Sequence, residues 1–390
     1  MKLKKRVIVI GDYNMNILYL CTFYHRAMIF HDLSKGLISL GNKVTVFNAV
    51  AKGTKIDNKY LPIMTSDVIH KECFNKIDRY FYKIKQNKII KEVKKSLMVN
   101  DFNLVHSHNL FNGGYAAYRL NQEYNIPYIV TIRNTDINTF LKFPFFKKIA
   151  NDIIKDAAGI HFLSEPYKNQ FIENYVELEH KNEVYKKSKV ISNGLEIYWI
   201  NNINNSRKIL DSNKIRLLCV GKIDKNKNIE TTAKALELLI SKGYDISLTV
   251  VGQVLNKQVL ENLGKKDYIK IINYIPKEKL INIYREHDIY AMPSIHETFG
   301  RVYAEAMTQG LPVIYSKGQG FDGIFEEGCV GYSVESKNAE QIAEAIQKII
   351  LNYDEISKRC IEKAKIFNWE SISRSMNEFY ATAITKGVSK

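Results

Sequence analysis

The chain has 390 residues, of which 45% are hydrophobic and 25% are charged, with 20 Gly and only 7 Pro. A chain of this length usually forms two domains, and this composition excludes disordered and collagen-like proteins. The net charge is +16, and residues 1–200 hold 30 Lys or Arg against 18 Asp or Glu. A basic half of this kind attracts nucleic acid, an anionic membrane surface or a phosphorylated substrate.

The cysteines and the apolar runs indicate the compartment. The five cysteines are far apart, and no pair has the spacing of a zinc site or a redox motif, so we expect reduced thiols. The apolar run at residues 7–10 is too short for a signal peptide. No run approaches the roughly 18 apolar residues that a membrane-spanning helix needs. We therefore expect a soluble cytoplasmic protein.

Short β-rich runs alternate with helical segments along the first half of the chain. A helix is expected at residues 27–40, where it ends at Gly41. Strands are expected at residues 6–10, 43–47, 104–106, 128–131, 159–162 and 189–191. This alternation favours a mainly parallel sheet with helices on both faces.

The same pattern restarts after a polar stretch at residues 201–206, which is typical of a linker. The second series of strands is expected at residues 215–220, 247–251, 269–272, 289–292, 313–315 and 331–334, with helices at residues 228–239 and 339–352. We predict two Rossmann-like, doubly wound α/β domains that face a central cleft. The first covers residues 1–200 and the second covers residues 201–365, and a final helix in residues 366–390 packs back toward the first domain.

Ligands of open parallel sheets bind beyond the carboxyl ends of the strands. The strongest cluster of suitable residues there is the segment 293–310. Glu297 lies in a loop, Thr298 is expected to cap the next helix, Gly300 lets backbone approach a ligand, and Glu305 lies on the helix itself. The free N–H groups at a helix N-terminus favour a diphosphate, and the two carboxylates can hold hydroxyls on either side of it.

These residues resemble a known family. Glu297 and Glu305 have seven residues between them and are followed by Ala306-Met307 and Gly310-Leu-Pro-Val313. The segment is similar to the E-x7-E signature of retaining glycosyltransferases of family 4, which have the GT-B fold. The resemblance implies that Glu297 orients the transferred sugar, that Glu305 holds the ribose, and that Thr298, Phe299 and Gly300 bind the diphosphate.

Two further segments match the same family. Gly221, Lys222 and Lys227 resemble its G-[RK]-x4-K segment, which implies that both lysines are ligands of the leaving diphosphate. Gly320 lies in a glycine-rich segment, residues 318–323, which corresponds to a loop near the phosphates. The sequence there departs from the more usual G-G-x-x-E pattern, so a plain turn remains an alternative. No D-x-D segment of the metal-binding kind is present, and we expect no cofactor and no metal.

The first domain has fewer candidate residues. His106 and His108 follow a predicted strand on one side of it, and related enzymes place a histidine near the transferring sugar, so His108 is the first choice. Arg133 and Asp136 follow the next strand and are expected to contact acceptor or sugar hydroxyls, although they could also pair with each other. Gly11 ends the first predicted strand and resembles the glycine loop near the donor.

The resulting hypothesis is a retaining, metal-independent glycosyltransferase that moves a sugar from a nucleotide-diphosphate donor, with a UDP-sugar expected, to a hydroxyl. The acceptor would be a saccharide or a lipid-linked saccharide of bacterial capsule, lipopolysaccharide or another surface polysaccharide. The alternatives are a nucleotide-sugar epimerase and a non-catalytic protein of the same fold that binds sugar nucleotides. A nucleic-acid-binding protein is disfavoured, because neither an aromatic RNA-binding platform nor a recognition helix is evident.

A basic stretch in the first domain suggests contact with a membrane. Residues 76–95, from Lys76 to Lys95, contain eight Lys or Arg and two Asp or Glu, with apolar residues at near-helical spacing. Residues 140–148 add aromatic residues beside lysines. Such segments dock on anionic inner leaflets, so peripheral membrane association is expected. The alternative is that the apolar stripe packs on the sheet and the lysines are merely solvated.

Overall fold

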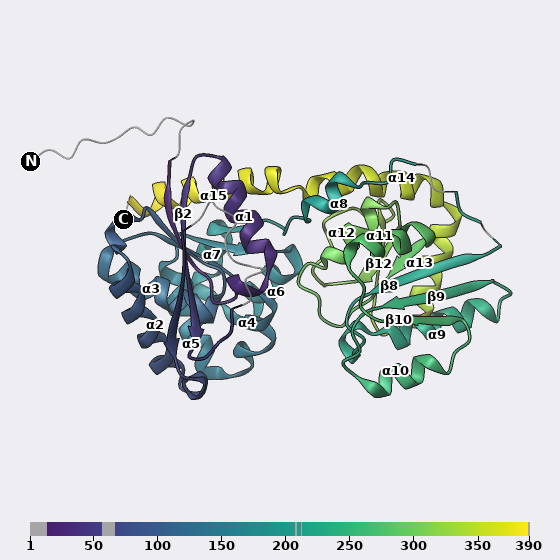
Figure 1. Ribbon diagram of the computed structural model, residues 1–390, viewed down its shortest axis with the longest axis horizontal. Helices are drawn as coiled ribbons and strands as arrows, with labels where there is room; N and C mark the ends of the chain where they lie inside the picture. Colours follow the sequence, from purple (N-terminus) through teal and green to yellow (C-terminus); the bar gives the residue numbers. More distant parts are fainter. Residues whose placement is uncertain (1–13, 57–66, 207–208, 212, 389–390) are drawn as a thin grey trace, which may run out of the picture. The chain divides into compact units, whose positions relative to one another are not determined.

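The computed structural model describes residues 14–56, 67–206, 209–211 and 213–388, with side chains described as far as residue 385. The chain divides into two compact units. The first unit comprises Met1–Phe162, Phe171–Ile191 and Trp369–Lys390, and the second comprises Leu163–Gln170 and Ser192–Asn368. Figure 1 labels most of the helices and some of the strands of both units.

The first unit contains a parallel sheet of seven strands in the order β3-β2-β1-β4-β5-β6-β7. Its strands are β1 (Asn16–Leu20), β2 (Lys43–Ala51), β3 (Asp67–Phe74), β4 (Leu104–Ser107), β5 (Tyr128–Thr131), β6 (Gly159–Phe162) and β7 (Ser188–Val190). The strand order reverses between β1 and β4, and in doubly wound folds this reversal marks where a ligand binds.

The central strand of this sheet differs from the sequence prediction. We expected a strand at residues 6–10, which lie outside the described residues, whereas the strand between β2 and β4 is β1. Ile17 pairs with Val44 on one side and with Leu104 on the other. Both segments have an apolar run in the sequence, and the described pairing places β1 between β2 and β4. The strand β3 was not predicted at all.

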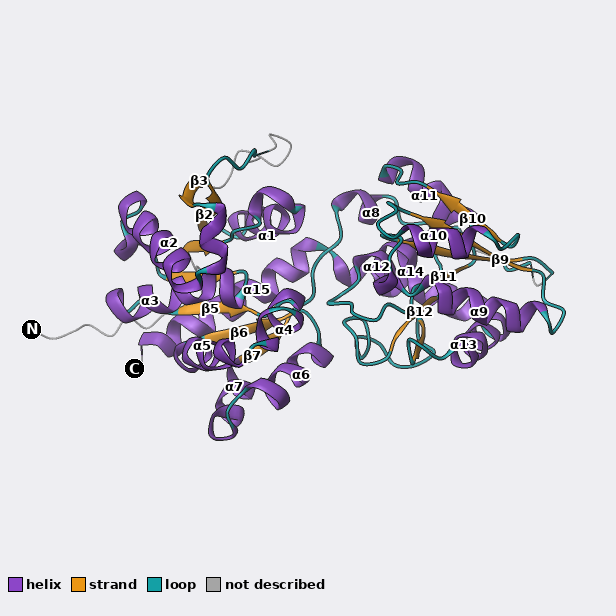
Figure 2. Cartoon of the chain, turned by 90° about the horizontal axis from the view of Figure 1, so that it is seen from below, coloured by secondary structure: helices purple, strands orange, loops and turns teal. Residues whose placement is uncertain are grey.

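Helices cover both faces of each sheet (Figure 2). In the first unit these helices are α1 (Met28–Ser39), α2 (Tyr82–Ser96), α3 (Tyr115–Tyr124), α4 (Asn134–Asn138), α5 (Pro144–Asp156), α7 (Lys181–Lys187) and α15 (Trp369–Val388), while α6 (Glu165–Tyr175) divides between the units. The last helix, α15, packs on α1. The two helices approach so closely at Gly36 that a Cβ there would lie 2.0 Å from Ser373 Oγ.

The second unit repeats the same strand order, β10-β9-β8-β11-β12-β13. Its strands are β8 (Ile215–Val220), β9 (Ile246–Val251), β10 (Ile269–Ile272), β11 (Ile289–Ala291), β12 (Val313–Ser316) and β13 (Gly331–Val334). The middle strands are apolar and buried because helices cover both of their faces. The reversal here lies between β8 and β11.

The helices of the second unit form where apolar residues recur every three or four positions. In α9 (Ile229–Ile240) the buried residues include Ala233, Leu236 and Leu239. Asn338 begins α13 (Ala339–Leu351) by accepting a hydrogen bond from the N–H of Gln341. The other helices are α8 (Ile197–Asn201), α10 (Lys257–Gly264), α11 (Lys277–Glu286), α12 (Arg301–Thr308) and α14 (Tyr353–Ala364).

The boundary between the units differs from the predicted one at residue 200. Residues 192–200 belong to the second unit, because Leu195 and Trp199 are buried in its core and Leu195 N–H donates to Phe367 O at 2.8 Å. The helix α15 belongs to the first unit. Among the described residues, no helix has both the length and the apolar character needed to cross a bilayer.

Candidate active site

Two loops of the second unit come together beyond the carboxyl ends of β8 and β11, the strands where the order reverses. Asp224 caps the short turn Lys225–Lys227 by accepting from Lys227 N–H at 3.0 Å. Asn226 ties this turn to the loop after β11. Its side chain donates to His296 O at 3.0 Å and accepts from His296 N–H at 3.1 Å. The two loops therefore form one rigid edge.

Lys227 and Glu297 form an ion pair across these loops. Lys227 Nζ lies 2.7 Å from Glu297 Oε2, and the two side chains are only 17% and 18% exposed. The aliphatic part of Lys227 lies over Gly221, where a Cβ would contact Lys227 Cε at 3.4 Å. Lys222, which follows Gly221 in the chain, is exposed. The structure thus brings Gly221, Lys227 and Glu297 together, as the sequence suggested.

The helix α12 begins directly after this loop. Its N-cap is Gly300, at φ 75°, with no side-chain cap, so the prediction that Thr298 caps the helix is wrong. A Cβ on Gly300 would meet the Tyr303 ring at 2.3 Å, and glycine also accepts the left-handed conformation. Thr298 is half-buried, whereas Phe299 is a core residue whose ring packs 5.5 Å from that of Phe367. Only the backbone of Phe299 is placed to bind a ligand.

The glycine-rich segment 318–323 packs against the same loop. Gly320 N–H donates to Glu297 O at 2.7 Å, and Glu297 N–H donates to Gln319 Oε1 at 3.0 Å. A Cβ on Gly320 would lie 2.0 Å from the backbone carbonyl of Thr298, so this position requires glycine. Asp322 closes the segment by accepting from Gly318 N–H at 2.7 Å. Residues 318–323, which depart from the usual family pattern, therefore form a turn in which Gln319 and Gly320 hold the backbone of Glu297.

Glu305 lies on α12 and faces other charged groups of the second unit. Burial raises the pKa of Glu305 to about 7, against the opposing effect of Arg301. Tyr284 Oη lies 3.5 Å from Glu305 Oε2. Glu196, which also raises this pKa, forms an ion pair with Lys277 at the start of α11. Sequence reasoning missed Glu196 and Lys277, because their pairing joins residues 81 positions apart and neither stands in a motif singled out above.

Gly252, which follows β9, is a third residue that sequence reasoning missed. A Cβ there would lie 1.7 Å from Gly221 O, so the chain after β9 can approach the chain after β8 only without a side chain. Gly252 N–H donates to Ile272 O at 3.0 Å and Gly221 N–H donates to Val251 O at 2.9 Å. The strand ending in Gly252 was a visible signal, but nothing in the sequence indicated the close approach.

In the first unit, His106 belongs to a buried chain of hydrogen bonds. His161 Nε2 lies 2.8 Å from Ile191 O, and Thr131 Oγ1 lies 2.9 Å from His161 Nδ1 and 2.8 Å from His106 Nε2. His106 Nδ1 lies 2.5 Å from Tyr380 Oη. Burial lowers the pKa of His106 well below its usual range and that of His161 to about 4, so both rings are neutral. Because the carbonyl of Ile191 only accepts, His161 donates to it through Nε2, and His106 then donates to Thr131 through Nε2. His106 therefore anchors α15.

His108 is buried beside this chain. Its ring lies 4.1 Å from that of His106 and 4.3 Å from that of Tyr19, between centroids, so the H-x-H pair does point to one side. Burial, with further contributions from His106 and Arg133, lowers the pKa of His108 well below its usual range. His108 Nε2 is buried without a hydrogen-bond partner among the described residues.

Arg133 and Asp136 serve the loop that follows β5. Asp136 accepts from the backbone N–H groups of Leu110, Phe111 and Arg133 at 3.2, 3.3 and 2.9 Å. Burial raises the pKa of Asp136 to about 6, although these bonds oppose the shift. Arg133 Nε donates to His108 O at 2.8 Å, and its guanidinium lies 5.0 Å from the Phe30 ring. The side chains of Arg133 and Asp136 thus bind backbone groups. Their contact with acceptor or sugar hydroxyls stays a prediction. Gly11 lies outside the described residues.

One group of residues in the described part of the chain could hold a metal ion. The ligand atoms of Glu177, Glu179 and His180 lie within 4.8 Å of one another. Both glutamates are exposed, and all three residues belong to the first unit, whereas Lys227, Glu297 and Glu305 belong to the second.

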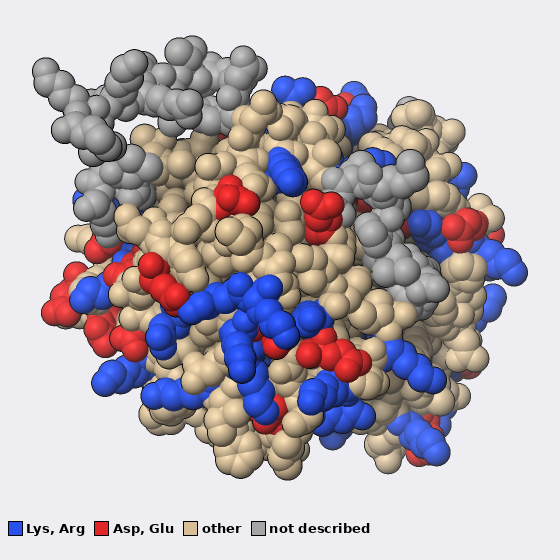
Figure 3. Space-filling view, turned by 60° about the vertical axis from the view of Figure 1, so that its left-hand side comes forward, with Lys and Arg blue, Asp and Glu red and all other residues tan. Residues whose placement is uncertain are grey.

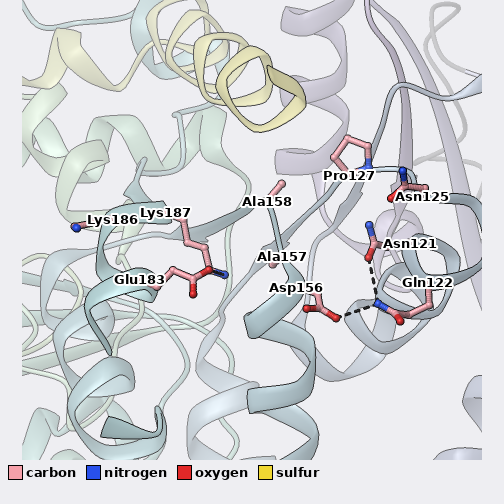
Figure 4. Close-up of a pocket in the computed structure, with 10 residues that line it drawn as sticks. All are labelled: Asn121, Gln122, Asn125, Pro127, Asp156, Ala157, Ala158, Glu183, Lys186 and Lys187. Carbon is pink, nitrogen blue, oxygen red and sulfur yellow. Dashed lines mark hydrogen bonds and ion pairs between the residues drawn. The ribbon is translucent and has the colours of Figure 1, made fainter. Parts of the chain in front are cut away.

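A cavity of about 300 Å³ lies at the edge of the first sheet formed by the amino ends of its strands. Figure 4 shows the residues that line it. Pro127 and Ala158 in its wall directly precede β5 and β6, so it opens at the amino ends of the strands. Gln122 Nε2 donates to Asp156 Oδ2 at 3.0 Å, and Lys187 donates to Glu183 at 3.0 Å. Asp156 and Glu183 therefore already have partners within the wall. The cavity is also not at the edge where ligands of such sheets bind.

The architecture and the two loops define a glycosyltransferase with the GT-B fold. Residues 27–197 match the family model described as Glycosyltransferase Family 4, and residues 202–367 match the model described as Glycosyl transferases group 1. The chain belongs to glycosyltransferase family 4.

Curated relatives include glycosyltransferases, and solved structures share the fold. The capsular polysaccharide biosynthesis glycosyltransferase CapM of Staphylococcus aureus is 27% identical over 237 residues, which are 57% of this chain and 60% of CapM, less than two thirds of either. Sucrose-phosphate synthase from Thermosynechococcus elongatus has a TM-score of 0.71 at 19% identity, over 94% of this chain and 98% of that one. Anabaena Alr3699/HepE in complex with UDP and glucose has a TM-score of 0.65 at 18% identity, over 93% and 98%.

Proposed function

We propose that this chain transfers a sugar from a UDP-sugar to a hydroxyl of a saccharide or lipid-linked saccharide, with retention at the anomeric carbon and without a metal. The observation that carries the proposal is the ion pair between Lys227 and Glu297 at the strand reversal of the second sheet. The likeness to a structure that holds UDP and glucose supports the choice of donor. The relative CapM supports a place in the synthesis of capsule, lipopolysaccharide or a similar surface polysaccharide.

Lys227 supplies the charge for the leaving diphosphate. A lysine ammonium group has three N–H donors, and the bond to Glu297 at 2.7 Å occupies one of them. The other two can meet phosphate oxygens, and the exposed Lys222 adds a second cation. A fixed cation beside the leaving group stabilises the charge that develops in the transition state, which is the task a metal performs in other transferases.

The carboxylates hold the two ends of the donor. Glu297 orients the sugar through its hydroxyls, with the free N–H groups at the start of α12 next to the diphosphate. Glu305, further along α12, accepts from the ribose hydroxyls. Gly221, Gly300 and Gly320 let the segments that carry Lys227 and Glu297 pack closely together next to the diphosphate, because they carry no side chain.

The reaction is a substitution on one face of the sugar. The bond between the anomeric carbon and the diphosphate oxygen breaks, and the acceptor oxygen bonds to the same face of that carbon. The acceptor's proton passes to the departing phosphate oxygen, so charge and protons balance. Retention follows because attack and departure share a face. His108, which belongs to the first unit, is the residue that we propose to lie next to the transferred sugar.

An epimerase is the weaker reading, because it requires free acid and base carboxylates in the first unit. The sequence offers no such pair of carboxylates, and the two oxygens of Asp136 already accept three backbone N–H groups. A non-catalytic binder of sugar nucleotides differs only in turnover, so an assay decides between them.

We further propose peripheral association with the inner face of the cell membrane. The buried residues of α2 are Gln86, Ile89 and Val93. The apolar residues Ile77, Phe81 and Ile84 of the predicted stripe are instead exposed, with Ile77 at 62%. Lysines flank them, which is the combination that anionic lipid surfaces attract.

The first experiment is thermal unfolding with UDP, GDP, ADP or CMP, each with EDTA present. A true ligand at about 100 times its dissociation constant stabilises the protein by roughly 2.7 kcal/mol. We expect this stabilisation with UDP in the wild type and its loss in Lys227→Ala.

The matched control is Lys225→Ala, which removes an exposed lysine from the same turn and should keep the response to UDP. Transfer assays with Glu297→Ala should show loss of turnover with an unchanged far-ultraviolet circular dichroism spectrum. A normal rate in both Lys227→Ala and Glu297→Ala, or a strict need for a divalent ion, contradicts the proposed site.

A further inference from the structure

The first unit contains a second cavity, of about 650 Å³, at the carboxyl edge of its sheet. Its wall comes from the ends of β2 and β3 and from the loops after β1, β4 and β5, so it spans the strand reversal. This is the position at which ligands of doubly wound sheets bind, and the volume is that of a typical small-molecule site.

The charged side chains in this cavity are all basic. Arg26, Arg79 and Lys85 line it, and no Asp or Glu is among its described lining residues. Lys85 Nζ donates to Asn112 Oδ1 at 2.9 Å and lies 5.1 Å from the centroid of the Phe74 ring. Burial, together with the nearby Arg79, lowers the pKa of Lys85 to about 8. A bound anion reduces the repulsion between clustered cations of this kind.

The rest of the wall is largely aromatic. Phe74, Phe140 and Phe146 lie in it, and the exposed rings of Phe23, Tyr80 and Phe143 stand at its rim. Thr22 Oγ1, also in the wall, is buried and has no hydrogen-bond partner among the described residues. An unpartnered buried hydroxyl is costly, and a phosphate oxygen would satisfy it.

The absence of acidic lining residues bears on the kind of ligand. Sugar hydroxyls need acceptors, and carboxylates, the strongest acceptors among side chains, are missing from the described wall. Three cations fit a negatively charged group, and the row of aromatic rings fits an apolar chain. A ligand that carries both is an amphiphile.

We propose that this cavity binds the lipid-phosphate part of the acceptor, that is, a phosphate ester of a long apolar chain. The phosphate lies between Arg26, Arg79 and Lys85, and the first units of the chain lie against Phe23, Tyr80 and Phe143. The inference rests on the proposed function, because it specifies the acceptor class of that transfer.

The test measures binding of geranylgeranyl monophosphate by isothermal titration calorimetry, in saturating UDP so that the donor site is filled. We expect binding at least about tenfold tighter than that of inorganic phosphate or of dodecyl maltoside. Inorganic phosphate tests the anion alone, and dodecyl maltoside tests the apolar chain with an uncharged sugar head. Equal affinity for either comparator overturns the proposal.

Two matched pairs of variants locate the site. Arg79→Ala should weaken binding at least about tenfold, whereas Lys91→Ala, an exposed cation on α2 outside the cavity, should not. Phe143 and Phe145 are 60% and 54% exposed, and only Phe143 lines the cavity. Phe143→Ser should weaken binding and Phe145→Ser should leave it unchanged. Equal effects within either pair overturn the assignment to this cavity.

The outcome also separates this inference from the function it rests on. If UDP stabilises the wild type but geranylgeranyl monophosphate does not bind, the donor site stands and the acceptor assignment fails. If UDP stabilises neither the wild type nor Lys225→Ala, the proposed function fails. Binding of the lipid phosphate still tests the cavity by itself.

Discussion

At the scale of single residues, Glu305, for which we propose a ligand-binding role, has a cost to stability. Its pKa of about 7 lies above its ordinary value of 4.5, so the folded state binds a proton more tightly than the unfolded chain does. The stability that this proton contributes is complete below about pH 4.5 and is lost as the pH rises to about 7. The buried carboxylate of Glu305 therefore lowers the free energy of unfolding at neutral pH when no ligand is bound.

Glu305→Gln tests this account through stability. We expect the variant to unfold at a higher temperature than the wild type at about pH 8, where the loss of the buried charge gains at most about 3 kcal/mol. At about pH 4.5 the two proteins should unfold at similar temperatures. The measurement is a pair of thermal scans at each pH, and a difference that does not grow with pH would contradict the raised pKa.

At the scale of elements, the hydrogen-bonded chain from Tyr19 through Tyr380 to Ile191 explains how α15 is held. Tyr19 Oη lies 3.1 Å from Tyr380 Oη, which in turn donates to His106 Nδ1. All of these side chains are buried, so each lost partner leaves an unsatisfied polar group.

Tyr380→Phe should therefore destabilise the protein by about 1–3 kcal/mol, because it leaves the Tyr19 hydroxyl and His106 Nδ1 without their partner. Urea denaturation should show the lower midpoint. Tyr274→Phe, at a tyrosine that is 75% exposed, is the control and should change stability by less than about 0.5 kcal/mol. Equal midpoints for the two variants would mean that the chain contributes nothing to the attachment of α15.

The elements also show which features the sequence could predict. The strands of the second unit and the helix that starts at Trp369 follow local apolar periodicity, which the sequence displays directly. The strand β1 could not be chosen over residues 6–10, because only pairing with β2 and β4 distinguishes two similar runs.

The candidate site was predictable in part, for a related reason. Lys227 and Glu297 stand in recognisable motifs, and their meeting at 2.7 Å follows from the positions of β8 and β11. The sequence around Glu196 and Gly252 does not indicate which residues they contact. Their roles come from neighbours far along the chain, Lys277 and Gly221.

At the scale of the whole molecule, the positive charge favours anionic surfaces. Figure 3 shows one face on which Lys and Arg side chains gather in the lower half. The net charge of +16 comes mostly from residues 1–200. Attraction between exposed charges falls with ionic strength, so any membrane contact should be sensitive to salt.

We expect the protein to sediment with vesicles that contain anionic phosphatidylglycerol at about 50 mM salt and to be released at about 300 mM. Lys76→Glu with Lys83→Glu should weaken binding by at least about tenfold, since each basic residue contributes about 1 kcal/mol. Lys358→Glu with Lys363→Glu makes the same charge change on exposed residues of α14 and serves as the control. Equal binding to neutral vesicles would remove the membrane proposal.

The attachment of α15 to the first unit has a consequence for how the gene can be divided. The helix α15 completes the core of a unit whose other parts end at Ile191, so a fragment that stops there lacks the helix that packs on α1 and the partner of His106. A gene fragment that encodes only residues 1–191 therefore lacks part of the first unit. Co-expression of the C-terminal helix as a separate peptide, or a circular permutant that places it before Met1, is the rational route to an isolated first unit.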